Sequence, residues 1–145
     1  MPIMASNRPR PFLDTNVLFS ALYRSSGAAG NILQRHAEGR LIIVISRQVL
    51  DELVGTIRTK KPDLLPLLQT FLLNAPPELT ADPEPAEVHR MSSFINAADA
   101  PILAAAVQSD ADCLVTGNTR HFTPEVAKRA NISIVSPSAY LAKLG

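Results

Sequence analysis

Short apolar segments alternate with longer segments of helical spacing along this chain, and this alternation restricts its fold more than any other feature. The apolar segments read as buried strands: 12–13 (FL), 41–46 (LIIVIS), 113–118 (CLVTGN) and 132–137 (ISIVSP). Between them, apolar residues recur every three or four positions, as they do in helices. Strands joined by helices predict a parallel sheet that is covered by helices on both faces.

The expected helices begin and end at recognisable residues. Gly39 and Ser46 read as a left-handed cap and an N-cap, and Pro62 and Pro101 stand in first turns. One predicted helix starts near Val17, and others cover about 28–38, 62–73 and 138–144. A helix follows Ser46 with apolar positions from 49 to 57, and another lies in the segment 96–112 (NAADAPILAAAVQSDAD). The turn-rich segment 80–89 (TADPEPAEVH) is predicted to be a surface connection inside the domain.

Composition limits the class of protein. With 145 residues, 46% apolar and 19% charged, the chain has the size and polarity of one globular domain. We expect 10–145 to form that domain and 1–9 to be a flexible extension. The apolar runs are too short to span a membrane, no signal peptide is evident, and Cys113 is a lone cysteine, so we expect a cytoplasmic protein. A net charge of +1 means that any nucleic-acid binding must depend on a local site.

Polar residues that follow the predicted strands are the first candidates for a site. Asp14, Ser46 and the turn 116–118 all lie just past strand ends, where parallel sheets bind their ligands. Taken alone, Asp14 fits a helix cap or an Asx turn. Asp99 heads the apolar stripe of its helix, so it either caps that helix or is a buried acid that needs a partner.

Helical geometry does not choose between Asp51 and Glu52, which flank the apolar stripe of their helix on opposite sides. Carboxylates that converge at one sheet edge would repel each other unless a cation joined them. Oxygen ligands without clustered Cys or His favour Mg²⁺ or Mn²⁺ over zinc, and such ions commonly serve phosphodiester chemistry.

The sequence resembles a known family in four segments that occur in a fixed order. They are FLDTNVLFSAL (12–22), ISRQVLDELVGTI (45–57), ADAPILAAAVQSDADCLVTGN (98–118) and TRHF (119–122). This set is similar to the PIN-domain ribonucleases, and within them to the VapC-like toxins of bacterial toxin–antitoxin pairs. The resemblance covers about 12–144 and implies a three-layer α/β/α sandwich with a central parallel sheet.

The resemblance also implies which residues carry the chemistry. Asp14, Glu52 and Asp99 would be the metal-binding and catalytic acids, and the Glu-Leu pair in VLDELV selects Glu52 over Asp51. Asn118 stands at a fourth catalytic position that is often Asp in the family, and it lowers the negative charge of the site. The implied reaction is hydrolysis of single-stranded RNA by water that Mg²⁺ or Mn²⁺ activates.

Other residues would assist this site. Three polar residues would position a carboxylate or a metal-bound water: Thr15, Asn16 and Thr116. Three basic residues near strand ends are either RNA contacts or ordinary solvated charges: Arg47, Arg120 and His121. The resemblance further implies a small antitoxin partner and a homodimer, for which the helices within 28–73 could supply the surface.

Two other functions compete with this one. A haloacid-dehalogenase-like phosphatase would use Asp14 as nucleophile and Ser46 after the second strand, but the second acid that it needs is Asn16 here. A catalytically silent PIN fold would bind RNA or a protein partner without cutting, which Asn118 and the near-neutral charge make conceivable. Three converging acids favour the enzyme.

Overall fold

The structure is a computed structural model that describes residues 7–145, and its centre is one parallel sheet. The five strands are short: β1 (Pro11–Leu13), β2 (Val44–Ile45), β3 (Glu78–Leu79), β4 (Cys113–Val115) and β5 (Ile134–Val135). Their order in the sheet is β3-β2-β1-β4-β5, and every neighbouring pair is parallel. The central strands β1 and β4 are buried along their whole length, which is why they are apolar on both faces.

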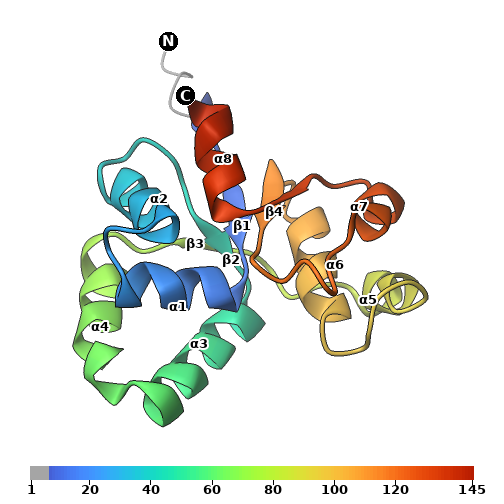
Figure 1. Cartoon of the computed structure of the whole chain (residues 1–145). Coiled ribbons are helices and arrows are strands. Elements are labelled where there is room, and N and C mark those ends of the chain that lie inside the picture. The colour runs from blue at the N-terminus through green and yellow to red at the C-terminus, as the bar shows by residue number, and fades with distance from the viewer. Residues whose placement is uncertain (1–6) are drawn as a thin grey trace.

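Helices connect the strands and cover the sheet (Figure 1). They are α1 (Thr15–Tyr23), α2 (Ala28–Ala37), α3 (Arg47–Lys60), the 3₁₀ turn η2 (Pro62–Leu64), α4 (Leu65–Asn74), α5 (Pro85–Met91), α6 (Ala100–Gln108), α7 (Pro124–Ala130) and α8 (Pro137–Leu144). The connections from β1 through β2 to β3 contain α1–α4, and those from β3 through β4 to β5, on the other side of β1, contain α5–α7. Figure 1 shows these two groups on either side of the sheet, and the predicted three-layer α/β/α sandwich is confirmed.

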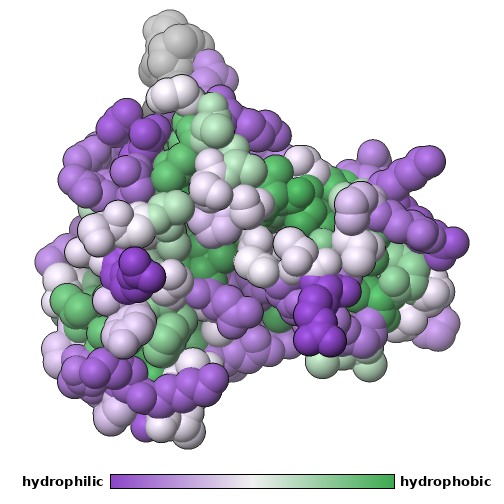
Figure 2. Space-filling view, viewed as in Figure 1, coloured by the Kyte–Doolittle hydropathy of each residue, from purple (hydrophilic) through white to green (hydrophobic). Residues whose placement is uncertain are grey.

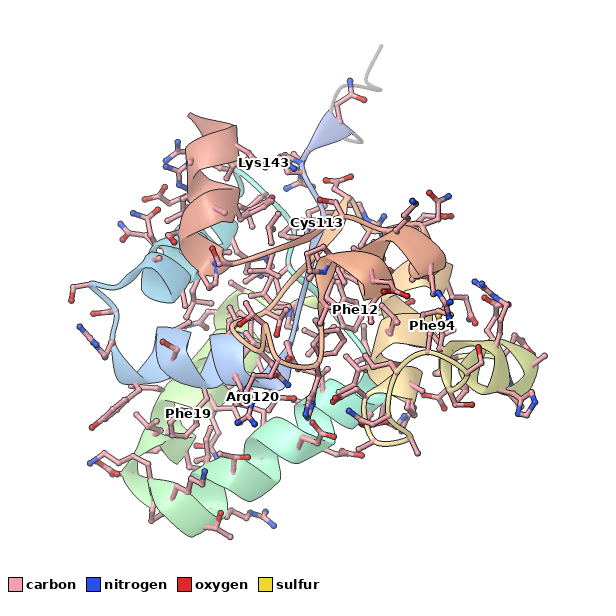
Figure 3. All side chains as sticks on the ribbon, turned by 45° about the vertical axis from the view of Figure 1, so that its right-hand side comes forward. Phe12, Phe19, Phe94, Cys113, Arg120 and Lys143 are labelled. Carbon is pink, nitrogen blue, oxygen red and sulfur yellow. The ribbon has the colours of Figure 1, made fainter. Side chains whose placement is uncertain are left out.

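The core lies between the sheet and both helical layers. Phe12 in β1 is fully buried near the middle of the molecule (Figure 3). Leu18 of α1 and Leu53 of α3 are buried in one layer, and Leu103 of α6 is buried in the other. The core therefore holds α1, α3 and α6 at fixed positions around the end of β1.

The order of the strands defines where a ligand can bind. The chain runs from β1 outward to β3 and then crosses to the other side of β1 to form β4 and β5. Parallel α/β sheets bind ligands outside the carboxyl ends of the strands, at the point where the strand order reverses. In this chain that point lies between Asp14, which follows β1, and Thr116, which follows β4.

The segment 80–89 corrects the prediction of a plain surface connection, because α5 begins inside it at Pro85. Proline is compatible with a first helical turn, and His89 and Arg90 favour the last turn. The helix was missed because it buries only Met91 and so has no apolar stripe. The two-residue strand β3 and the short helix α7 were not predicted either.

The expected extension 1–9 falls largely on 1–6, which lie outside the described residues. Within the described part, the carbonyl of Pro9 accepts a hydrogen bond from the backbone N–H of Ile42 at 2.8 Å. Across residues 7–145, every helix is too short or too polar to cross a lipid bilayer.

Candidate active site

Asp14 occupies the turn between β1 and α1 and is almost fully buried. Its backbone is extended, its N–H donates to the carbonyl of Val115 at 3.0 Å, and its Oδ1 accepts from the N–H of Thr15 at 2.8 Å. Asp14 is therefore the N-cap of α1, as its sequence context alone suggested. The cap uses only one carboxylate oxygen.

Thr116 binds the other oxygen of Asp14 across the point where the strand order reverses. Its hydroxyl donates to Asp14 Oδ2 at 2.8 Å and accepts from the backbone N–H of Asn118 at 3.0 Å. This one buried hydroxyl joins the ends of β1 and β4 and begins the turn that carries Asn118.

Glu52 reaches the same region from α3. The hydroxyl of Thr15 donates to Glu52 Oε1 at 2.9 Å, and the amide of Gln48, one turn earlier, donates to Oε2 at 3.0 Å. Thr15 thus links the Asp14 turn to the Glu52 carboxylate. Glu52 lines the cleft and Asp51 does not, which settles the side of α3 that faces it.

Asp99 stands at the start of α6, but its side chain makes no capping hydrogen bond, so capping is not its role. The adjacent cap is made by Asn96, whose Oδ1 accepts from the N–H of Asp99 at 3.0 Å. Asp99 Oδ2 accepts from Asn96 Nδ2 at 2.8 Å and lies 2.7 Å from His121 Nδ1. The Asp99 side chain is 17% exposed, so this acid has partners and still reaches solvent.

These side chains line one open cleft of about 430 Å³ at the carboxyl end of the sheet. Ten residues form its walls: Asp14, Thr15, Asn16, Glu52, Gly55, Thr56, Thr59, Asp99, Ile102 and Asn118. Figure 2 shows a hydrophilic surface between the two groups of helices, where the outline of the molecule is indented. The walls of the cleft are acidic and include no Lys or Arg.

The pKa of Asp14 depends on its burial and on the charge of the cleft. Burial raises the pKa of Asp14 above its usual value, and the carboxylates of Asp99 and Glu52 raise it further. Hydrogen bonds from Thr116 and Thr15 lower the pKa and so keep the charged form accessible. A bound cation would favour that charged form further.

The donor chemistry of this cleft fits a hard divalent cation, because three carboxylates and the Asn118 amide supply oxygen ligands. The arrangement is not a closed ligand set: among the described residues, no group of three or more His, Cys, Asp or Glu side chains is close enough to hold an ion. Each acid is held by a neighbouring N–H or O–H group instead.

The predicted site residues fall into two groups. Asp14, Thr15, Asn16, Glu52, Asp99 and Asn118 line the cleft, and Thr116 supports it from beneath. The predicted RNA contacts lie outside its walls. Arg47 is exposed and lies 3.9 Å from Asp82, Arg120 extends from the loop after β4 in front of α1 in Figure 3, and His121 binds Asp99.

The sequence analysis did not predict some of the residues at this site. Gly55, Thr56 and Thr59 follow Glu52 by three, four and seven positions, which is the spacing of one helical face. Asn96 precedes Asp99 by three, a spacing typical of side-chain capping. Gln48 and Ile102 carried no signal that separates them from other helical residues.

Ser46 does not support the phosphatase alternative. Its hydroxyl accepts from the N–H of Val49 at 3.3 Å and caps α3, and Ser46 is almost fully buried outside the walls of the cleft. A second acid is also absent two residues after Asp14, where Asn16 stands.

Comparison with known proteins places the chain in a family. The PIN domain matches residues 10–120. No curated protein sequence matches significantly. Among solved structures, VapBC2 from Rickettsia felis, bound to a DNA fragment from its promoter, is 22% identical with a TM-score of 0.61, and the likeness covers 86% of this chain and 96% of that one.

Two further crystal structures share the fold. FitAcB from Neisseria gonorrhoeae is 20% identical with a TM-score of 0.58, over 88% of this chain and 98% of that one. PAE2754 from Pyrobaculum aerophilum is 20% identical with a TM-score of 0.60, over 97% of this chain and 96% of that one. At such low identities the likeness shows a common fold.

Proposed function

Because the chain belongs to the PIN domain family, as its sequence motifs indicated, we propose that it is a divalent-metal-dependent endoribonuclease that hydrolyses single-stranded RNA. The observation that carries the proposal is the acidic cleft. Asp14, Glu52, Asp99 and Asn118 come from four separate parts of the chain and line one cleft at the carboxyl end of the sheet. The choice of RNA follows from the resemblance to PIN-domain ribonucleases.

Asp14, Asp99 and Glu52 would hold the ion, which is Mg²⁺ or Mn²⁺ in this proposal. Such an ion lowers the pKa of a bound water and neutralises charge on the phosphate. Carboxylate and amide oxygens, which line this cleft, are the ligands that these metals prefer.

The chain's own residues would orient the reacting groups. Thr116 and the N–H of Thr15 hold the Asp14 carboxylate in one orientation, and the Thr15 hydroxyl does the same for Glu52. Glu52 is more exposed than Asp14, so it can also receive a proton from the attacking water. The Asn118 amide can donate to a phosphate oxygen without adding negative charge.

RNA binding would depend on a few local cations, because the net charge is only +1. Arg120, on the loop between β4 and α7, would meet a phosphate of the bound RNA. Arg47 is exposed, and its distant pairing with Asp82 is weak enough to give way to RNA. We place the activity in the cytoplasm, where RNA is present and a lone cysteine stays reduced.

We also propose that the protein is the toxin of a toxin–antitoxin pair. An antitoxin would place a basic side chain in the acidic cleft and an apolar helix in a groove nearby. Exposed apolar side chains suit protein partners: Leu67 and Leu73 on α4 are 51% and 81% exposed, and Tyr23 at the end of α1 is 56% exposed. The α4 pair lies within the helical region expected to support a homodimer.

Cleavage of a labelled single-stranded RNA pool tests the proposal. The wild type should cut RNA in Mg²⁺ or Mn²⁺ and not in EDTA, and Asp99→Asn and Glu52→Gln should both lose activity. Asp51→Asn is the matched control, since Asp51 neighbours Glu52 and lies outside the cleft. If wild type and Asp99→Asn are equally inert in every metal while RNA still binds, the chain is a binding module.

A further inference from the structure

The two oxygens of Asp99 differ in a way that the oxygens of the other cleft acids do not. Asp99 Oδ2 is bound by Asn96 Nδ2 and His121 Nδ1, whereas no hydrogen bond within residues 7–145 reaches Oδ1. Both oxygens of Asp14 accept hydrogen bonds, and so do both oxygens of Glu52. Asp99 Oδ1 is therefore the carboxylate oxygen most readily available to a ligand in the cleft.

The contact between His121 and Asp99 determines where the imidazole proton lies. An ionised carboxylate can only accept, so the 2.7 Å contact of its oxygen with Nδ1 is a hydrogen bond when Nδ1 carries the hydrogen. The Asn118 amide, 3.3 Å from the same nitrogen, then finds no lone pair there. The charge-assisted bond to Asp99 is the shorter and stronger of the two, so His121 faces Asp99 as a donor.

Two donors on one oxygen restrict the rotation of the carboxylate. The terminal torsion of an Asp side chain is broad and nearly two-fold, so a free carboxylate would present either oxygen to the cleft. Asn96 lies before α6 and His121 lies on the loop after β4, so their bonds approach Asp99 from two different segments. We call these two donors the Asp99 clamp.

We propose that His121 is a positioning residue: together with Asn96 it fixes the Asp99 carboxylate so that Oδ1 is directed to a divalent cation in the cleft. This inference rests on the metal site of the proposed function. We assign His121 this role in place of the expected RNA contact, because its Nδ1 is bound to Asp99. Partners that orient a metal ligand typically contribute 10- to 100-fold to metal affinity.

Titration calorimetry with Mn²⁺, in the absence of RNA, tests the Asp99 clamp. His121→Ala should weaken Mn²⁺ binding by about tenfold or more. His121→Asn should stay within about threefold of wild type, because the amide nitrogen branches from the same carbon as Nδ1 and can also donate. His89→Ala is the matched control, since His89 is an exposed histidine on α5 outside the cleft.

Half of the His121 side chain is exposed, so these variants should fold, which thermal unfolding will verify. RNA affinity in EDTA should be the same for wild type and His121→Ala. The inference is overturned if His121→Ala keeps wild-type Mn²⁺ affinity, if His121→Asn falls as far as His121→Ala, or if wild type binds no Mn²⁺. Binding that follows the expected pattern without any RNA cleavage would instead refute the nuclease and retain the clamp.

Discussion

Both ends of the parallel sheet carry acidic side chains, and the hydrogen-bond partners of these acids differ between the two ends. At the amino end, Arg10 donates from Nε and Nη2 to the Glu78 carboxylate and from its backbone N–H to Asp112. The same guanidinium donates to the carbonyls of Ser109 and Asp110 at 3.1 and 3.2 Å. The hydrogen bond with Glu78 is the main cause that raises the pKa of Arg10.

At the carboxyl end, the acids have hydroxyl, amide and imidazole donors in place of a lysine or arginine. Among the ion pairs within residues 7–145, none joins a Lys or Arg to Asp14, Glu52 or Asp99. Thr15, Thr116 and the clamp residues orient these carboxylates without a lysine or arginine charge. The amino end therefore uses charge for stability, and the carboxyl end keeps negative charge that a ligand cation can use.

The largest expected effect follows from removing one of these uncompensated charges. Asp14→Asn should slow RNA cleavage in Mn²⁺ by about 100-fold or more, the size typical of losing a group that assists proton transfer or holds the ion. Asn can still cap α1, and its amide can donate to the Thr116 hydroxyl. The free energy of unfolding in urea should therefore stay unchanged or rise; a large decrease would show that Asp14 is a structural residue.

Arg10→Met should have the opposite profile. The variant keeps an unbranched apolar stem but leaves Glu78 and two carbonyls without their donor, so we expect the free energy of unfolding to fall by about 1.5–3 kcal/mol. Cleavage of RNA should stay within about twofold. Arg40→Met is the matched control, because Arg40 forms an exposed pair with Glu38 that should contribute less than about 1 kcal/mol. If Arg10→Met and Arg40→Met lose the same free energy of unfolding, the Arg10 contacts do not stabilise the amino end more than an exposed ion pair does.

The carboxyl end was largely predictable from sequence, since parallel strands bring the residues after them to one edge. Asp14 and the turn that begins at Thr116 meet there because β1 and β4 are neighbours in the sheet. Glu52 required the family resemblance, because helical periodicity alone did not distinguish it from Asp51.

What could not be predicted depends on contacts between distant segments. His121 reaches Asp99 from a loop 22 residues further along the chain, and no local pattern encodes that approach. The same holds for Arg10, which lies 68 residues before Glu78 in the sequence. The helix α5 was missed for a different reason, since proline and acidic residues serve both turns and first helical turns.

Cys113 provides a test of how well the amino end excludes water. It begins β4, is buried, and lies beside Asp112, and burial raises the pKa of its thiol from 9.0 to about 11. The folded state thus prefers the neutral thiol, so its contribution to stability is present below pH 9 and is lost as pH rises toward 11. The free energy of unfolding should fall by about 1 kcal/mol between pH 8 and pH 10 through this group.

Urea unfolding of wild type and Cys113→Ala at both pH values isolates this contribution from other titrations. The difference in free energy of unfolding between wild type and Cys113→Ala should change by about 1 kcal/mol between pH 8 and pH 10. An unchanged difference would mean that water reaches the thiol and that the amino end opens locally. Figure 3 shows Cys113 below Lys143, whose charge lowers the thiol pKa but does not offset burial.

The last prediction compares two helical glycines, Gly55 in α3 beside the cleft and Gly30 in α2. A Cβ on Gly55 would meet nothing within 4 Å because it would point into the open cleft, so Gly55→Ala should raise the free energy of unfolding by about 0.5–1 kcal/mol. A Cβ on Gly30 would lie 2.7 Å from the carbonyl oxygen of Arg24 and closer to that of Ser25, so Gly30→Ala should be destabilising by about 1–3 kcal/mol.

Gly55→Leu should keep the higher stability expected of Gly55→Ala and slow RNA cleavage, because its side chain would occupy space that the substrate needs. If Gly55→Ala lowers stability, the space beside Gly55 is not free. If Gly55→Leu cleaves as fast as wild type, RNA does not occupy the cleft beside Glu52.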